Sequence, residues 1–294
     1  MTARLTLTAG PLELELAPAV GGSIARFELI RGESGHALLR PAPDDFSDVL
    51  QASCFPLVPF ANRIRGGTFT CDGRGIVLAP NMAGDKSPIH GQGWRGAWEV
   101  EAADDRSARL AFRHPGGEWP WAWEGREVFT LDEAGLTVTL ACRNLSAEPM
   151  PCGLGLHPFF PCNRDTRLQA AVEAVWTVDA DVLPVSRESA SGRYALDDRA
   201  ICGQGLDNGY DGWDGRARIH WPDRAIALEV RSADAGRFQV FSPPEGGVFV
   251  AEPVQNANAA LNAPRDQWPS LGITVLAQGE EACLRARFEI IAPD

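Results

Sequence analysis

The chain has 294 residues, of which 45% are hydrophobic and 22% charged, and its formal net charge at pH 7 is −12. This balance is ordinary for a soluble globular protein, and the excess of negative charge disfavours nucleic acid and anionic membranes as partners because both would be repelled. The sequence contains no run of eighteen or more apolar residues, which excludes a membrane-spanning helix.

Alternation of apolar and polar residues with a period of two predicts β-strands from the amino terminus onward. Residues 12–16 place leucines on one face and glutamates on the other. The same stretch lacks the apolar core of a secretion signal, so we expect a cytoplasmic location. Further strands are predicted, in chain order, at 24–30, 97–101, 108–113, 125–131, 136–140, 168–178, 216–221, 225–231, 237–241, 247–251 and 284–290. Clusters of glycine, proline, asparagine and aspartate separate these strands, as turns require.

Helical periodicity is nearly absent from the sequence. The best candidate, residues 257–263, would form one or two turns at most, and the strands do not alternate with helices as a parallel βαβ architecture requires. The pattern is weakest over 180–215, where we expect a long surface excursion. Because strands extend along the chain without a low-complexity linker, we predict a single domain over residues 1–294, all-β, built as a large antiparallel β-sandwich.

Cysteine and lysine usage narrows the possible chemistry. The seven cysteines are an odd number without a C-x-x-C pair, which argues against a disulfide framework and against a thiol-rich zinc site. Lys86 is the only lysine and lies in a loop-like GDKSP context, whereas a Schiff-base lysine needs a desolvated amine.

Four segments rich in polar and turn residues interrupt the strand pattern: 54–69 with Arg63, 87–98 with His90, 153–161 with His157 and 248–262 with Glu252. Each residue alone has a structural interpretation, such as an arginine whose stem packs while its head meets solvent. A carboxylate at the position of Glu252, after an apolar strand, is costly to bury unless it is paired. Together the two histidines, the arginine and the carboxylate suit general acid–base chemistry on an uncharged polar substrate.

An aromatic cluster, EWPWAWEGR, contains Trp119, Trp121 and Trp123. Indole rings stack well on the apolar faces of sugars, so these residues could line a sugar site. Packing at the edge of a large sandwich is the interpretation that we favour.

The order of the polar segments along the chain resembles the motif order of the aldose 1-epimerase (galactose mutarotase) family. ANRIRGGTF resembles the N-R-I segment of that family, IHGQGW its H-G segment, LHPFF its H-P-[YF]-F segment, and VAEP the segment with its late glutamate. LDNGYDGW, at 206–213, resembles the segment that carries a substrate-binding aspartate. The five motifs extend over roughly residues 50–262.

The resemblance implies a galactose mutarotase-like supersandwich, a free aldose as substrate, and no metal or organic cofactor. It also implies that His157 is the general acid and Glu252 the general base. The residues expected to bind the sugar hydroxyls and the ring oxygen are Asn62, Arg63, His90 and Asp207.

In the expected reaction Glu252 accepts the proton of the anomeric hydroxyl while His157, as an imidazolium, protonates the ring oxygen. The two opposite charges are expected to favour each other. Two departures from the family pattern bear on the sugar rather than on the reaction. HPFFP carries Phe159 where tyrosine is common, and HGQGW is shorter than the usual glycine-rich segment.

Other functions remain open on the sequence alone. A glycoside hydrolase on the same sandwich would need two carboxylates, for which Glu252 and Asp207 are the candidates. A non-catalytic sugar-binding protein would keep the fold without the reaction. A hexose-phosphate mutarotase would require Arg63, Arg65 and Arg95 to converge. A metal site of His90, His157 and Glu252 is disfavoured because no H-x-H or H-x-x-x-H spacing occurs. Oligomeric state is not indicated.

Overall fold

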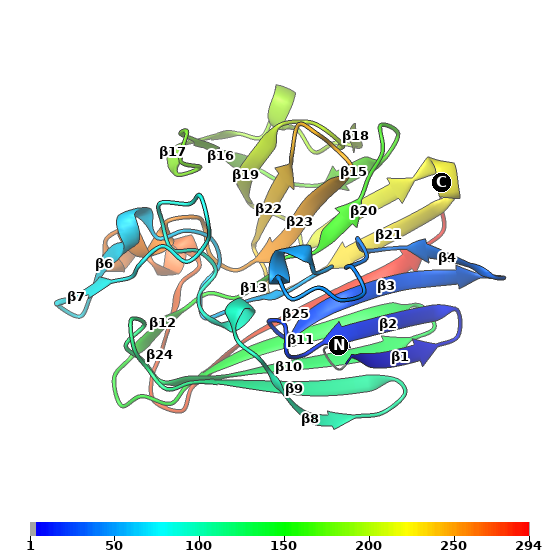
Figure 1. Cartoon of the computed structure of the whole chain (residues 1–294). Helices are drawn as coiled ribbons and strands as arrows, with labels where there is room; N and C mark the ends of the chain where they lie inside the picture. The colour runs from blue at the N-terminus through cyan, green and yellow to red at the C-terminus, as the bar shows by residue number, and fades with distance from the viewer. Residues whose placement is uncertain (1–3, 294) are drawn as a thin grey trace.

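The computed structural model describes residues 4–293, which form antiparallel strands joined by turns and short 3₁₀ helices (Figure 1). The 3₁₀ helices are η1 (Val49–Gln51), η2 (Arg65–Gly67), η3 (Gly93–Arg95), η4 (Gly192–Tyr194), η5 (Pro222–Arg224), η6 (Ala260–Asn262), η7 (Arg265–Gln267) and η8 (Pro269–Leu271). No α-helix occurs within residues 4–293. The predicted all-β class is confirmed.

Two large sheets form the sandwich. The nine-stranded sheet has the order β18 (Arg199–Ala200), β15 (Arg167–Ala170), β20 (Arg216–Trp221), β21 (Ile226–Arg231), β25 (Glu281–Ile291), β11 (Gly135–Asn144), β10 (Trp123–Asp132), β9 (Ser107–His114) and β8 (Glu99–Ala103). The eight-stranded sheet has the order β17 (Pro184–Ser189), β16 (Ala174–Val178), β19 (Leu206–Asp211), β22 (Arg237–Ser242), β23 (Val248–Val254), β13 (Gly155–Leu156) and β5 (Pro56–Leu57), and β14 (Phe159–Pro161) also pairs with β23.

Smaller sheets complete the structure. A four-stranded sheet contains β1 (Leu5–Ala9), β2 (Leu12–Ala17), β3 (Ser23–Arg31) and β4 (Ser34–Ala37). Two hairpin-sized sheets pair β6 (Thr68–Cys71) with β7 (Arg74–Val77), and β12 (Met150–Cys152) with β24 (Thr274–Leu276). The β6–β7 pair projects at the left of Figure 1.

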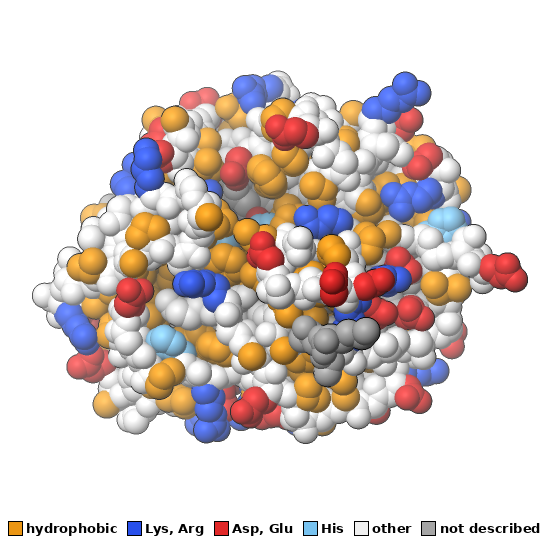
Figure 2. Space-filling model, viewed as in Figure 1, with side chains coloured by type: hydrophobic (Ala, Val, Ile, Leu, Met, Phe, Trp, Pro, Cys, Tyr) orange, Lys and Arg blue, Asp and Glu red, His pale blue; other side chains and the backbone are white. Residues whose placement is uncertain are grey.

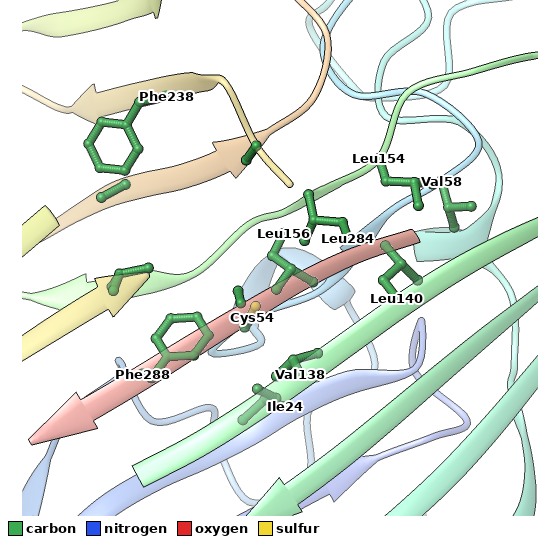
Figure 3. Close-up of a cluster of buried hydrophobic side chains, with 14 of the residues drawn as sticks. Ile24, Cys54, Val58, Val138, Leu140, Leu154, Leu156, Phe238, Leu284 and Phe288 are labelled. Atoms are coloured by element: carbon green, nitrogen blue, oxygen red, sulfur yellow. The ribbon is translucent and has the colours of Figure 1, made fainter. Parts of the chain in front are cut away.

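The main core lies where the two large sheets face each other (Figure 3). Side chains of β11 and β25 pack against Leu154 and Leu156 from the segment around β13. They include Val138, Leu140, Leu284 and Phe288. Along both strands buried and more exposed residues alternate, which is the period-two pattern that the sequence predicted.

Two sequence-based predictions differ from the structure, whereas the one or two helical turns expected within 257–263 are present as one 3₁₀ turn. The single strand predicted at 168–178 is two strands, of which β15 joins the nine-stranded sheet and β16 the eight-stranded sheet. The excursion expected over 180–215 contains β19, an internal strand that pairs with both β16 and β22. Its Asn208–Gly209 dipeptide suggests a turn, but Asn208 is buried and donates to the Trp176 carbonyl at 2.9 Å. The helical candidate 257–263 contains only η6.

The tryptophan cluster belongs to the core. Trp119, Trp121 and Trp123 are each at most 3% exposed. Trp119 packs against Phe60, with 5.2 Å between ring centroids. The packing interpretation is confirmed, and these rings offer no face to a sugar.

Within residues 4–293 we find no helix that is long and apolar enough to cross a membrane. All seven cysteine thiols are free in this structure.

One core position is chemically unusual: Glu127 of β10, which is 2% exposed and lies between Leu110 of β9 and Leu140 of β11. Its Oε2 atom has no hydrogen-bond partner among the described residues. Burial raises the pKa of this carboxyl well above its ordinary value, so the folded protein favours the protonated acid.

We therefore predict that Glu127 lowers the free energy of unfolding by an amount that grows with pH. A folded-state pKa above the unfolded value means that the folded state binds the extra proton, so stability falls as pH rises above about 4.5 toward the raised pKa. The substitution Glu127→Gln removes the ionisable carboxyl and with it this pH dependence of stability. The free energy of unfolding of the variant minus that of the wild type should increase with pH above 4.5, by up to about 1.4 kcal/mol per pH unit, in urea titrations at pH 5, 6, 7 and 8. A pH-independent difference would contradict the prediction.

Candidate functional site

The site begins with the register between β23 and its two short neighbours. β13 places Gly155 opposite Val254, and β14 places Phe159 opposite Val250. The intervening His157 therefore lies opposite Glu252. The distance between His157 Nε2 and Glu252 Oε1 is 3.4 Å, and the two side chains are 13% and 3% exposed.

The same sheet face continues across two further strands. Gln239 of β22 is the register partner of Glu252, so its side chain lies beside the carboxylate on the same face. Asp207 of β19 is opposite Phe241 of β22, which lies two residues from Gln239 and so on that face too. The Gln239 Nε2 amide donates to Asp207 Oδ1 at 2.8 Å. A row of polar side chains thus crosses four adjacent chain segments.

Loops supply the opposite wall, and two of their residues support each other. The backbone N–H of Asn62 donates to His90 Nδ1 at 3.1 Å, and the N–H of His90 donates to the Asn62 carbonyl at 3.1 Å. Both residues have positive φ, 61° and 62°, which is uncommon for a histidine. Because Nδ1 accepts a hydrogen bond, the neutral imidazole carries its proton on Nε2. Burial lowers the pKa of His90 well below its usual value, so this ring is a neutral donor.

Arg63 is held by Asp85, with 2.7 Å between Arg63 Nε and Asp85 Oδ2. The other two arginines considered for a phosphate do not join it. Arg65 Nη1 lies 3.7 Å from Asp179 Oδ2, and Arg65 donates to the Pro184 carbonyl. Arg95 lines a neighbouring cavity, which shares Leu50 and Met82 with the cavity of Arg63. The three arginines therefore do not converge.

All six residues predicted from the sequence line one cavity of about 340 Å³: Asn62, Arg63, His90, His157, Asp207 and Glu252. Gln239 joins them, and the apolar lining consists of Leu50, Phe55, Met82, Ile89, Phe159 and Phe241. In the view of Figure 2 the surface is hollowed near its centre, with histidine atoms visible in the hollow.

Three buried polar atoms of cavity-lining residues have no partner among residues 4–293: His157 Nδ1, Glu252 Oε2 and Gln239 Oε1. Buried polar groups without partners are rare because each costs free energy. A polar, hydrogen-bonding ligand in this cavity would satisfy these three atoms.

The protonation of the central pair differs from our expectation. Burial lowers the pKa of His157 to about 3. Burial, and then the charge of Asp207, raise the pKa of Glu252 well above its usual value. Both pKa shifts favour the uncharged forms, in which His157 is a neutral imidazole and Glu252 is a protonated carboxylic acid. The imidazolium–carboxylate pair is therefore not the favoured form of these two buried residues, because desolvation disfavours both charges.

Sequence reasoning missed the residues that hold the site together. The Asn256 side chain accepts from the Ala61 N–H at 3.1 Å and donates to the carbonyls of Ala61 and Ala257. Asn258 accepts from the Arg63 N–H at 3.1 Å. Asn262 accepts from the Arg65 N–H at 2.7 Å and donates to the carbonyls of Arg65 and Thr68. The spacing N-A-N-A-A-L-N, which begins four residues after Glu252, was the available signal.

Two further features were also missed. Gln239 lies in an apolar strand, FQVF, where its side chain could be expected to face solvent. Phe55 stacks on His157, with ring centroids 4.5 Å apart and an interplanar angle of 15°. As for metals, no group of three or more His, Cys, Asp or Glu side chains in residues 4–293 is arranged to hold an ion.

Comparison with known proteins gives a consistent picture. The sequence model of the aldose 1-epimerase family matches residues 4–288. YphB of Escherichia coli K12, a protein without a characterised function, is 36% identical over 259 residues, which cover 87% of this chain and 84% of YphB.

Solved structures have the same fold. A proposed aldose 1-epimerase from Escherichia coli K12 superimposes with a TM-score of 0.90 and 31% identity, over 99% of both chains. A galactose mutarotase-like protein from Clostridium acetobutylicum gives a TM-score of 0.85 at 18% identity, over 98% of this chain and 94% of that one. The supersandwich is therefore confirmed.

The three asparagines give a prediction about stability. Asn256 and Asn262 each form three hydrogen bonds to backbone groups, but Asn256 is 2% exposed whereas Asn262 is exposed, so water can replace only the bonds of Asn262. Asn256→Ala should lower the free energy of unfolding by about 1–3 kcal/mol, and Asn262→Ala by less than about 1 kcal/mol. Urea denaturation of both variants measures the difference. Equal losses would show that burial of the amide does not matter.

Proposed function

The chain belongs to the aldose 1-epimerase family, and from that premise we propose that it interconverts the α and β anomers of a free aldose. The observation that carries the proposal is the pair of His157 and Glu252, 3.4 Å apart at the base of a cavity of about 340 Å³. The unpartnered polar atoms of this cavity supply hydrogen-bonding groups for a sugar ring.

The proposed reaction moves two protons. With the closed sugar bound, His157 is the imidazolium and Glu252 the carboxylate. Glu252 accepts the proton of the anomeric hydroxyl as the C1–O1 bond becomes a carbonyl, the C1–O5 bond breaks, and His157 donates its proton to O5. Rotation about C1–C2 presents the other face of the aldehyde, and the reverse transfers close the ring.

Burial of His157 and Glu252 favours the protonation state that follows ring opening. After ring opening His157 is neutral and Glu252 protonated, which is the form that desolvation favours. The open-chain aldehyde therefore coincides with the protonation state of the pair that burial favours, whereas the closed sugar requires the charged state. Before ring opening, the single proton has to move from Glu252 to His157, across a short distance within the site.

The remaining polar residues orient the sugar. The Nε2–H of His90 and the guanidinium of Arg63 are donors for oxygens that gain negative charge, as in electrostatic stabilisation of a developing oxyanion. Asn62, Asp207 and Gln239 bind hydroxyls. The cavity lining contains one guanidinium and two carboxyls, a balance that supports a neutral sugar over a phosphorylated one.

Substitution of the pair provides the test. Glu252→Gln and His157→Asn should each lower the rate of mutarotation by about 10²- to 10⁴-fold, because each removes one general acid–base transfer. Polarimetry of freshly dissolved α-D-glucose, α-D-galactose, D-xylose and L-arabinose measures the approach to the equilibrium rotation.

Matched controls are Glu133→Gln and His220→Asn, which change the same residue types away from the cavity and should retain full activity. Near wild-type turnover in either cavity variant would overturn the assigned roles. Sugar binding without any acceleration would indicate a binding protein, and release of reducing sugar from a glycoside would indicate a hydrolase using Glu252 and Asp207.

A further inference from the structure

The two ends of the cavity differ in chemistry. Asp207 and Gln239 lie at one end, where the Gln239 amide donates to the Asp207 carboxyl. At the other end His157 packs against two aromatic rings that also contact each other, Phe55 at 4.5 Å and Phe159 at 4.6 Å between centroids. Apart from Glu252 and His90, the cavity side chains around the residue assigned as the general acid are thus apolar rings.

This asymmetry orients the sugar, an argument that rests on the proposed function. If His157 protonates the ring oxygen O5, then C5 and its substituent are the next atoms of the sugar on that side. The C5 substituent therefore lies at the apolar end. The hydroxyls of C2 and C3, on the other side of C1, point toward Asp207 and Gln239.

His157, Glu252 and His90 are the hydrogen-bonding side chains near this end, and the proposed reaction uses all three. The other cavity-lining side chains here, Leu50, Phe55 and Phe159, offer no hydrogen bond to a further hydroxyl. The guanidinium of Arg40 covers Phe159, 3.9 Å from the ring centroid, and donates to the backbone carbonyls of Leu50 and Ala52 rather than into the cavity. Leu50, which is 39% exposed, and Phe55 complete this end.

We propose that the preferred substrates are aldoses whose C5 carries a hydrogen or a methyl group, that is, aldopentoses and 6-deoxyaldohexoses, over aldohexoses with a 6-hydroxyl. A hydroxymethyl group at this end would lose water without gaining a partner. An apolar pocket rejects an added hydroxyl by up to about 100-fold. The preference should therefore be about 10- to 100-fold in kcat/KM.

Two pairs of sugars that differ only at C6 test the proposal. D-fucose is D-galactose without the 6-hydroxyl, and D-xylose is D-glucose without C6. We expect kcat/KM for mutarotation, measured by polarimetry, to be about 10- to 100-fold higher for the deoxy or pentose member of at least one pair. The pair with the larger ratio tells whether a methyl group or a hydrogen fits better. Ratios of one or less in both pairs would overturn the proposal.

Substitutions at the apolar end test whether this end of the cavity sets the substrate preference. Phe159→Tyr adds a hydroxyl at the apolar end and should lower the ratio of kcat/KM for D-fucose to that for D-galactose by about tenfold. Leu50→Asn, at an exposed position with little risk to folding, should act in the same direction. Phe112→Tyr adds the same hydroxyl to a half-buried ring outside the cavity and should leave the ratio unchanged. An unchanged ratio in both cavity variants would contradict the proposal.

Binding separates this inference from the proposed function. Calorimetric titration of the wild type with D-fucose and D-galactose measures affinity without turnover. Tighter binding of D-fucose with no mutarotation would support the inference and contradict the proposed function. Mutarotation of D-fucose and D-galactose with equal kcat/KM and equal affinity, together with equal kcat/KM for D-xylose and D-glucose, would support the proposed function and overturn the inference.

Discussion

The whole site depends on one constraint, the antiparallel register of β23 with its neighbours. That register places His157 and Gln239 on either side of Glu252 and turns all three toward the cavity. In a β-strand a shift of one residue moves every side chain to the opposite face. Such a shift in β23 would direct Glu252 into the sandwich core and bring Ala251 to the cavity. The register is fixed by the apolar residues of β23 that alternate with Glu252 and pack into that core.

Much of the fold follows from local sequence because the alternation of side chains in a strand is local. The leucines of β2 and the Val138 face of β11 were therefore evident from single segments. The partition of 168–178 between two sheets was not, because an apolar stretch does not reveal which sheet receives it. The strand β19 was missed since Asn208–Gly209 is typical of a turn, and only its pairing with β16 and β22 makes it a strand.

The candidate site shows the same division between local and distant information. The motifs around His157 and Glu252 were visible, but their opposition across two strands joins residues 95 positions apart and needs the register. The asparagines after Glu252 were visible as letters, whereas their partners lie in the loop of Asn62 and Arg63. Gln239 resembled a solvent-facing strand residue, and only the eight-stranded sheet places it beside a buried carboxyl. The charge state of the pair was also missed, because proximity predicts attraction while burial, which the sequence does not report, disfavours both charges.

The asparagine contacts have a consequence for how the protein is made. Asn256 bonds to Ala61, 195 residues earlier in the chain, and Asn258 and Asn262 bond to the same loop over comparable separations. Contacts so distant in sequence form late and slow folding, because the intervening chain has to be ordered first. A growing polypeptide whose loop of residues 61–65 has left the ribosome lacks the partners of this loop until residues 256–262 follow. The cavity is therefore completed only after both sheets of the sandwich have most of their strands.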